Sequence, residues 1–265
     1  MSTIAVAQFV PGGDRQANLA VIEGFARDAA GRGATLVVFP EYSSFFEEQM
    51  SAASVAAAEP LDGEFVTAFG AIAAELGIHL VAGMLETTDD PGRFSNTLIA
   101  VAPTGEVVAR YRKLHLYDAF GQRESDWVLA GAIEHPETFE WKGFTVGLQT
   151  CYDIRFPEVT RRLVDAGADL VLVPAEWVRG PLKEQHWRTL VTARAIENTI
   201  YIAAADHAPP IGVGNSMIVD PMGVELATIG DDSAVAVAEV TRDRIVAVRE
   251  RNPALTLRRF GVHQL

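Results

Sequence analysis

Gly33-Ala-Thr-Leu-Val-Val-Phe-Pro-Glu41 and Gly167-Ala-Asp-Leu-Val-Leu-Val-Pro-Ala175 are two versions of one pattern, a glycine followed by an apolar run that ends at a proline. Continuous apolar runs of this length are typical of strands that are covered on both faces. Two more pairs repeat in the same order, since residues 3–8 resemble residues 145–150 and residues 96–99 resemble residues 215–218. The sequence therefore predicts two related half-sheets.

Short strands and longer helices account for most of the remaining sequence. Residues 97–112 and 216–228 each contain the Pro-x-Gly turn of a β-hairpin, so both half-sheets should contain antiparallel strands. Gly33, Gly77 and Gly167 follow predicted helices closely, as glycines that end helices do. These patterns predict an α/β fold in which two mixed β-sheets pack together with helices outside, a four-layer α-β-β-α sandwich. The predicted strands are residues 4–9, 36–40, 78–84, 97–102, 107–112, 144–150, 170–174, 201–205, 216–219, 224–228 and 234–240, and the predicted helices are residues 16–32, 64–76, 157–166, 184–198 and 242–249.

The composition narrows the class of protein. The chain has 265 residues, of which 49% are hydrophobic and 22% are charged, as in a folded globular protein. We expect a single domain over residues 1–265, because no linker rich in Pro, Gly or Ser divides it. Acidic residues outnumber Lys and Arg, 35 to 22, which gives a formal charge of −13. With no basic cluster, neither nucleic acid nor an anionic membrane is expected as a partner.

Signals for membrane insertion or secretion are not evident. No apolar run approaches the roughly 18 residues of a transmembrane helix. Residues 1–8 have no basic segment before their apolar run, so we expect no signal peptide and a cytoplasmic protein. Cys151 is the only cysteine, which excludes an intramolecular disulfide and a cysteine-rich zinc site.

Cys151 is the first candidate for a catalytic residue. It follows a predicted apolar strand, and Pro157, six residues later, suits the first turn of a helix. A thiol between a strand end and a helix start can meet backbone N–H groups and the positive end of the helix, and both favour a thiolate. From its position alone, a buried structural cysteine is the alternative.

Three charged residues are the other candidates. Glu41 ends a buried apolar run, where a carboxylate lies at the rim of the fold, pairs with a cation or has a shifted pKa. A general base needs such a setting. Lys113 ends the first hairpin and could pair with Glu41 and stabilise an oxyanion. Glu124 lies in a loop, either as a surface acid or as a carboxylate placed over a site.

The combination of these residues is more specific than any one of them. Pro-Glu after an apolar strand, Arg-Lys-x-His at a hairpin end and Cys-Tyr-Asp-x-Arg-Phe-Pro-Glu after another strand occur in that order. From residue 4 to about residue 240, the sequence resembles the nitrilase superfamily of carbon–nitrogen hydrolases. The resemblance implies an α-β-β-α sandwich. It places the family's catalytic Glu, Lys and Cys on Glu41, Lys113 and Cys151, and its second glutamate on Glu124.

The resemblance also implies a mechanism. Cys151 would attack the carbonyl of a small-molecule amide, with Glu41 as the general base. Lys113 and the backbone N–H of Tyr152 would hold the oxyanion. Ammonia would leave, and water would then hydrolyse the thioester. Glu124 would orient Lys113 or the substrate nitrogen, and neither a metal nor another cofactor is required.

Several motifs resemble one branch of the superfamily. Cys-Tyr-Asp stands where nitrile-hydrolysing members usually have Cys-Trp-Glu. With His186-Trp187 and Ala193-Arg-Ala-Ile-Glu-Asn198, it resembles the ω-amidases and deaminated-glutathione amidases. A small carboxylated ω-amide is therefore the expected substrate. The alternatives are an amidase for neutral, aromatic or N-carbamoyl compounds, a nitrilase, an acyltransferase on the same scaffold, and a binding protein without activity.

The expected pocket departs from that branch at one segment. Glu176 and Trp177 stand where ω-amidases have a smaller Ala-Phe segment. They follow the strand that repeats the strand of Glu41, so they should border the site and reshape the pocket. Tyr42, next to Glu41, is expected to line the pocket as well.

A substrate carboxylate would need a cation in the pocket. Arg155 or Arg179 could supply a guanidinium for it. Arg155 could equally be a structural partner of Glu158 or of another acid.

The expected assembly follows from the resemblance, because members of the family usually form dimers or larger oligomers. We therefore expect a homodimer or a larger homo-oligomer. Residues 253–265 are apolar for a tail, with Leu255, Leu257, Phe260 and Val262. We predict that this tail packs across a subunit boundary.

Overall fold

Twelve strands form two six-stranded sheets in the computed structural model, which describes residues 2–265. The order is β12-β1-β2-β3-β4-β5 in the first sheet and β6-β7-β8-β9-β10-β11 in the second. In each sheet three neighbouring strands run parallel, β1-β2-β3 and β7-β8-β9, and the strands beside them are antiparallel. The strands are β1 (Ser2–Gln8), β2 (Leu36–Val38), β3 (His79–Thr87), β4 (Phe94–Val101), β5 (Val107–Arg112), β6 (Thr138–Trp141), β7 (Phe144–Leu148), β8 (Leu170–Pro174), β9 (Tyr201–Ala205), β10 (Met217–Val219), β11 (Glu225–Thr228) and β12 (Ala234–Val240).

The matching strand orders confirm the internal repeat that the sequence predicts. The strands β1, β2 and β4 occupy the same places in the first sheet as β7, β8 and β10 in the second. These are the strands whose sequences resemble one another. Both predicted hairpins are present, as β4–β5 and β10–β11.

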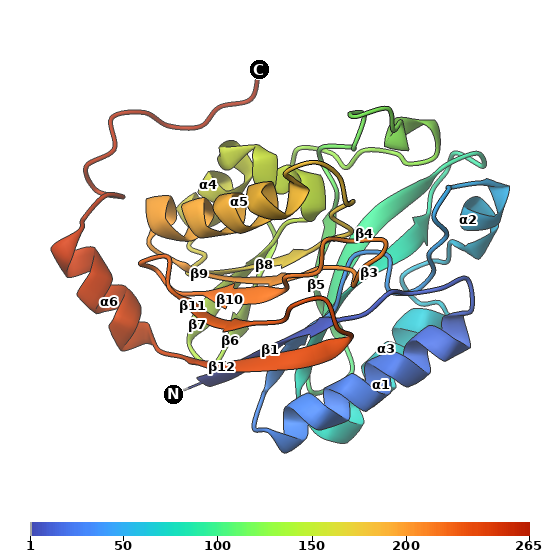
Figure 1. Cartoon of the computed structure of the whole chain (residues 1–265), viewed down its shortest axis with the longest axis horizontal. Coiled ribbons are helices and arrows are strands. Elements are labelled where there is room, and N and C mark those ends of the chain that lie inside the picture. Colours follow the sequence, from blue (N-terminus) through green and yellow to red (C-terminus); the bar gives the residue numbers. More distant parts are fainter. Residues whose placement is uncertain (1) are drawn as a thin grey trace.

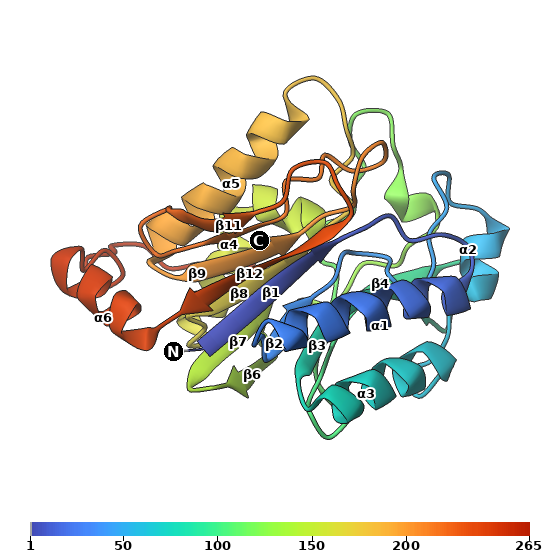
Figure 2. The ribbon, with the colours of Figure 1, turned by 60° about the horizontal axis from the view of Figure 1, so that its bottom comes forward.

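Helices cover the outer face of each sheet, and the inner faces pack on each other (Figure 1). Helices α1 (Arg15–Gly31) and α3 (Glu64–Leu76) lie side by side over the first sheet (Figure 2). Helices α4 (Pro157–Asp165) and α5 (Lys183–Asn198) cover the second sheet. The buried core between the sheets takes Leu36 from one sheet and Trp141 and Leu170 from the other. The structure is the predicted four-layer α-β-β-α sandwich.

The ends of several helices follow from local chemistry. The side chain of Asp14 caps α1 by accepting hydrogen bonds from two main-chain N–H groups of its first turn. Gly77 ends α3 in the left-handed conformation (φ 67°), which favours glycine. Pro157 occupies the first position of α4, where its missing N–H has no helical acceptor to lose. The α6 helix (Arg242–Arg251) follows β12.

Two short elements differ from the sequence prediction. Helix α2 (Ala52–Ala57) has six residues, too few for a helical period to show in the sequence, and a capping box between Ser51 and Ser54 begins it. Strand β6 alternates buried Phe139 and Trp141 with more exposed neighbours, but it has only four residues and pairs with β7 at the sheet edge. Strands β2 and β7 each end two residues before the predicted end, because the chain leaves the sheet there toward the site described below.

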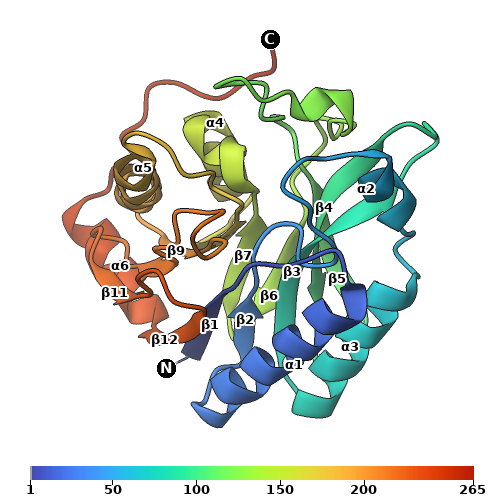
Figure 3. The same cartoon turned by 45° about the vertical axis from the view of Figure 1, so that its right-hand side comes forward.

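Loops from both sheets gather beyond one end of the sandwich (Figure 3). Strand β2 leads to Glu41, β7 leads to Cys151, and β8 leads to Glu176. Strand β5 ends one residue before Lys113. Since the carboxyl ends of parallel strands are where α/β layers collect ligand sites, this end of the molecule is the place for a functional site.

The tail, residues 253–265, has no helix or strand and runs along the outside of the molecule beyond α6 (Figure 1). Leu257 is 69% exposed and Phe260 is 89% exposed. Arg258 forms an ion pair with Asp165 of α4 at 2.5 Å. Within residues 2–265, none of the helices combines the length and the apolar character needed to traverse a bilayer.

Candidate active site

Glu41 is fully buried in the loop after β2, with every carboxylate oxygen engaged. Its Oε1 accepts hydrogen bonds from the Asn96 side chain (2.6 Å) and the Lys113 ammonium (2.9 Å). Its Oε2 accepts one from the main-chain N–H of Glu176 (2.7 Å). The ring Nε2 of His207 donates to the Glu41 carbonyl (2.7 Å). The side chain and the main chain of Glu41 are therefore both held in place.

A close approach of β3 helps to position this loop. A Cβ atom on Gly83 would lie 2.6 Å from the main-chain nitrogen of Tyr42 and 2.8 Å from Cα of Glu41. Real Cβ contacts do not come this close, so only glycine lets β3 pass under the loop. The position of Glu41 thus depends on the absence of a side chain at residue 83.

Lys113 lies between two carboxylates and is 2% exposed. Its Nζ is 2.9 Å from Glu41 and 2.9 Å from Glu124. Burial by itself would lower the pKa of Lys113, but the attraction of Glu124 and Glu41 outweighs it and raises the pKa well above the ordinary value. The residue is a permanent cation at neutral pH, which suits it to stabilise negative charge.

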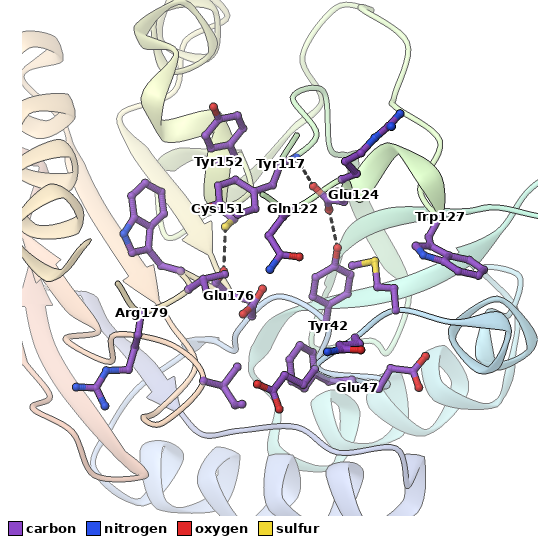
Figure 4. Close-up of a pocket in the computed structure, with 18 of the residues that line it drawn as sticks. Tyr42, Glu47, Tyr117, Gln122, Glu124, Trp127, Cys151, Tyr152, Glu176 and Arg179 are labelled. Atoms are coloured by element: carbon purple, nitrogen blue, oxygen red, sulfur yellow. Dashed lines mark hydrogen bonds between the residues drawn. The ribbon is translucent and has the colours of Figure 1, made fainter. Parts of the chain in front are cut away.

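Glu124 opens a short 3-10 helix, η1 (Glu124–Asp126), and is buried. Besides Lys113, it accepts hydrogen bonds from the Tyr42 hydroxyl (2.6 Å) and the Tyr117 main-chain N–H (2.5 Å), both drawn in Figure 4. The structure therefore places Glu124 against Lys113, as expected from the sequence, and gives it no freedom to turn toward solvent.

Cys151 is the first residue of a second 3-10 helix, η2 (Cys151–Arg155), with a left-handed backbone (φ 45°) that is unusual outside glycine. The side chain is buried, and Sγ lies 3.4 Å from the carbonyl oxygen of Glu176 (Figure 4). Burial raises the pKa of Cys151 well above its ordinary value, and the charge of Glu41 adds to the effect while Lys113 opposes it. Burial and the charge of Glu41 thus act against the effect that the helix start was expected to have, and they favour the protonated thiol.

The turn that carries Cys151 leaves a backbone donor free. Tyr152 is in the first turn of η2, so its N–H has no acceptor within that helix. Asp153, in the same turn, accepts a hydrogen bond from the Tyr111 hydroxyl (2.7 Å), and its other carboxylate oxygen lies 2.7 Å from Nδ1 of His115. These contacts fix the turn. Within residues 2–265, the Tyr152 N–H is without an acceptor, and it belongs to the residue that follows Cys151.

A cavity of about 610 Å³ opens over these residues. Cys151 and Glu176 lie on one side of it and Tyr42 and Glu124 on the other (Figure 4). The volume suits a small molecule rather than a folded chain. Within residues 2–265, no group of three or more His, Cys, Asp or Glu side chains is arranged to hold a metal ion.

Glu176 and Trp177 both border the cavity, as the sequence predicts. Burial and the nearby Glu41 raise the pKa of the Glu176 carboxyl well above its ordinary value. Trp177 is 3% exposed, and its ring packs on Trp187 (5.4 Å between centroids) in the core under α5. Trp177 is therefore at once a core residue and a wall of the cavity.

The two arginines expected near a substrate carboxylate differ in their surroundings. Arg179 lines the cavity but is half exposed and lies 3.8 Å from Glu184. Arg155 is not part of the cavity wall; its guanidinium lies 4.8 Å from the Trp177 ring centroid and near the ring of His186. Among the described residues it makes no ion pair with Glu158, so that structural alternative is wrong.

Three residues of the site are not predicted from the sequence. Asn96 bridges Glu41 (2.6 Å) and Glu124 (3.2 Å), and its place in the repeated Asn-x-x-Ile motif is a signal that could have found it. Tyr117 and Lys183 form a pair inside the cavity (2.6 Å between Oη and Nζ). They are 66 residues apart in the sequence, and no local pattern connects them.

Comparisons with known proteins agree with this fold and identify the family. Residues 3–250 match the family model of carbon–nitrogen hydrolases. The chain is 39% identical over 264 residues to the deaminated glutathione amidase of Escherichia coli O157:H7, covering 99% of both chains. Its fold is similar to that of a variant of the amidase of Nesterenkonia AN1 from the nitrilase superfamily, with a TM-score of 0.79, 29% identity and 96% of both chains covered.

The NitFhit protein of C. elegans is also similar in structure, with a TM-score of 0.88 and 28% identity over 97% of this chain. The chain spans 65% of the NitFhit chain, just under two thirds of its length. The family match covers most of the sequence and confirms the resemblance seen in the catalytic motifs. The protein thus belongs to the carbon–nitrogen hydrolase family of the nitrilase superfamily, and it is an enzyme with amidase relatives.

Proposed function

We propose that this enzyme hydrolyses a small carboxylated ω-amide to the acid and ammonia through a thioester on Cys151. The observation that carries the proposal is the convergence of Glu41, Lys113 and Cys151, of which Lys113 and Cys151 line the cavity and Glu41 holds Lys113 from behind it. A buried thiol with a raised pKa needs a base beside it, and the Glu41 carboxylate is such a base.

In the first half of the reaction, Glu41 takes the proton of the Cys151 thiol as Sγ attacks the amide carbonyl. The carbonyl oxygen gains the negative charge, which Lys113 and the Tyr152 N–H stabilise by ionic and hydrogen bonds. Glu41 then gives its proton to the departing nitrogen. The C–N bond breaks, ammonia leaves, and the acyl group remains on sulfur.

In the second half, water takes the place of ammonia. Glu41 removes a proton from the water as its oxygen attacks the thioester carbonyl, and the same two donors hold the charge. The C–S bond breaks, the thiolate recovers the proton from Glu41, and the carboxylic acid departs. Glu124 positions the Lys113 ammonium in both halves of the reaction through their 2.9 Å contact. Glu124 is itself held by hydrogen bonds from the Tyr42 hydroxyl and the Tyr117 N–H.

Two observations support a carboxylated substrate. The E. coli relative at 39% identity is named a deaminated glutathione amidase. The cavity is also lined by several cations besides Lys113, namely Arg123, Arg179 and Lys183, which would attract an anionic group. A neutral or aromatic amide, an N-carbamoyl amide and a nitrile would use the same nucleophile, but a neutral group would gain little from these positive charges.

Ammonia release from a panel of compounds tests the proposal. The panel pairs carboxylated ω-amides (α-ketoglutaramate, succinamate, deaminated glutathione) with neutral and aromatic amides, N-carbamoyl amino acids and a nitrile. We expect turnover of the carboxylated amides by the wild type and none by Cys151→Ala. Undiminished ammonia release by Cys151→Ala would refute the mechanism, and a preference for neutral amides would refute the substrate class.

Hydroxylamine separates the thioester route from direct hydrolysis. A thioester on Cys151 should transfer its acyl group to hydroxylamine and give a hydroxamate in competition with the acid. Absence of any hydroxamate at saturating hydroxylamine would speak against a covalent intermediate. If other amines or thiols are acylated faster than water, the enzyme is an acyltransferase on this scaffold.

A further inference from the structure

Lys183 is a buried cation with no acidic partner among the residues that the structure describes. It is the first residue of α5, lines the cavity and is 6% exposed. Within residues 2–265, no carboxylate lies within 4 Å of its Nζ. Its single hydrogen-bond partner in that part of the chain is the Tyr117 hydroxyl, at 2.6 Å.

Aromatic rings surround this ammonium where an acid would be expected. Its Nζ lies 4.2 Å from the centroid of Phe120, 4.8 Å from that of Tyr117 and 5.4 Å from that of Trp177. Rings stabilise a cation only weakly compared with a carboxylate. Burial and the neighbouring Arg155 accordingly lower the pKa of Lys183. Lys113, by contrast, has two carboxylates at 2.9 Å, and its pKa is raised.

Arg155 increases the positive charge at the same place. Its guanidinium lies 4.8 Å from the Trp177 ring centroid, so one indole contacts two cations. The Nε of Arg155 is buried without a hydrogen-bond partner among the described residues. The α5 helix also begins here without a capping side chain, so its positive end is open. Buried charges in proteins are normally paired, so this arrangement needs an anion.

The hydrogen-bond donors of Lys183 and Tyr117 suit the two oxygens of a carboxylate. One of the three N–H groups of the Lys183 ammonium donates to the Tyr117 oxygen, and the other two are available. Burial, followed by the charge of Cys151, raises the pKa of Tyr117 to about 12, so the phenol keeps its proton and can donate it. An ammonium and an adjacent phenol O–H can thus each donate to one oxygen of a carboxylate.

We propose that Lys183, with Tyr117, binds a carboxylate on the substrate and so selects amides that carry a negative charge at a distance from the scissile bond. The inference rests on the proposed amide hydrolysis and names the residue that sets its preference. Lys183 is here a specificity residue, because it touches a part of the substrate that does not react.

Matched pairs of substrates isolate this role. Malonamate, succinamate and glutaramate each differ from their diamides only in that a distal carboxylate replaces a neutral amide. For the chain length that the wild type prefers, we expect Lys183→Met to lower kcat/KM for the carboxylated member by roughly 10- to 100-fold, mainly through KM, as for a lost charge-assisted hydrogen bond. The diamide should change less than about threefold, since a surplus cation contributes little to a neutral group.

Three further variants locate the effect. Lys183→Arg should recover part of the preference, because it restores the charge. Lys142→Met removes a lysine outside the cavity and should leave the preference unchanged. Arg179→Met tests a second cation of the cavity wall, the one with a guanidinium half exposed to solvent. Equal losses on both members of a pair in Lys183→Met, or a larger loss of preference in Arg179→Met, would overturn the assignment.

Binding measured without turnover separates this inference from the proposed reaction. In the Cys151→Ala background, calorimetry should show that the carboxylated amide binds more tightly than its diamide, and that Lys183→Met abolishes the difference. If the wild type releases ammonia from neither member while this difference is present, the reaction is wrong and the carboxylate site stands. If the wild type hydrolyses amides but Lys183→Met leaves the difference intact, the site is wrong and the reaction stands.

Discussion

The main-chain N–H of Glu176 donates a 2.7 Å hydrogen bond to Oε2 of Glu41, and this contact joins a loop of the second sheet to a loop of the first. The carbonyl of the same Glu176 lies 3.4 Å from Sγ of Cys151. One peptide segment therefore touches both the proposed base and the proposed nucleophile through its main chain. The relative positions of Glu41 and Cys151 depend on the packing of the two sheets rather than on either loop alone.

Glu41→Gln should have opposite effects on turnover and on thiol ionisation. Loss of the base should lower kcat/KM for amides by about 10²- to 10⁴-fold. The charge of Glu41 raises the pKa of Cys151, so its removal should lower that pKa. The pH profile of iodoacetamide alkylation should therefore shift to lower pH in the variant.

Glu48→Gln is the matched control, because Glu48 lines the same cavity but is exposed. It should change neither turnover nor the alkylation profile. An alkylation profile in Glu41→Gln that stays in place, or moves to higher pH, would contradict the electrostatic coupling between Glu41 and Cys151.

Lys113→Met should impair both stability and activity. It leaves Glu41 and Glu124 buried without their shared cation, and breaking a buried ion pair in this way typically costs about 3–5 kcal/mol. Loss of an oxyanion donor should lower kcat by about 10²- to 10³-fold. Urea unfolding and ammonia release measure the two effects, with Lys142→Met as the control. A variant as stable as the wild type would show that the two carboxylates do not depend on Lys113.

Gly83→Ala should disturb the site through the backbone of β3. The added Cβ would meet the main chain of Tyr42 at 2.6 Å and that of Glu41 at 2.8 Å, so the loop must move. We expect a stability loss of about 1–3 kcal/mol, as for overpacking, together with a large loss of kcat. Gly24→Ala, in α1 with open space around it, should instead stabilise by about 0.5–1 kcal/mol and keep full activity. Wild-type kcat in Gly83→Ala would mean that the Glu41 loop adjusts freely.

His207 should make the fold sensitive to acid. Burial lowers the pKa of His207 from 6.5 to about 4, while the unfolded chain keeps the ordinary value. Between these two pH values the unfolded state binds a proton that the folded state does not, so the free energy of unfolding falls as the pH falls. For this one group the loss approaches roughly 3 kcal/mol.

Urea unfolding of His207→Gln at pH 7 and at about pH 4.5 measures this contribution. Glutamine can still donate to the Glu41 carbonyl but does not titrate near neutrality. The wild type should lose roughly 2–3 kcal/mol more than the variant between these two pH values. Equal losses in the two proteins would show that His207 is not protected from protonation.

Deletion of residues 253–265 should reduce the oligomeric state. Leu257 and Phe260 are exposed in the single chain, and we predict that a second subunit covers them. Size-exclusion chromatography with light scattering should show smaller particles, and thermal unfolding a lower Tm. Arg258→Ala, which removes the ion pair with Asp165 and a hydrogen bond to the Leu255 carbonyl but no apolar side chain, is the control and should keep the assembly. Unchanged size and stability after the deletion would refute the role of the tail.

The sequence by itself determined the elements and their order. The apolar runs around Val37 and Val171 and the Pro-x-Gly turns are local signals, so they predict strands and hairpins without knowledge of the rest of the fold. The repeat then implied two matching sheets, and both sheets have the same strand order. The motifs around Glu41, Lys113 and Cys151 were equally local, and they pointed to the residues that the fold brings together. Short elements such as β6 and α2 are too brief for such periodic signals to emerge.

Only the tertiary structure decided the electrostatics of the site. The pKa of Cys151 is raised because the packed sheets exclude water and bring Glu41 near, which no strand-end position reveals. Within residues 2–265, Lys183 has no ion-pair partner, and rings from two segments far apart in the sequence, Tyr117 and Phe120 from one and Trp177 from the other, lie around its ammonium. Interactions between residues far apart in the chain depend on distances that the packing of the two sheets sets. A sequence motif can therefore name the reacting groups, but their protonation and the charge of the pocket arise only when the layers assemble.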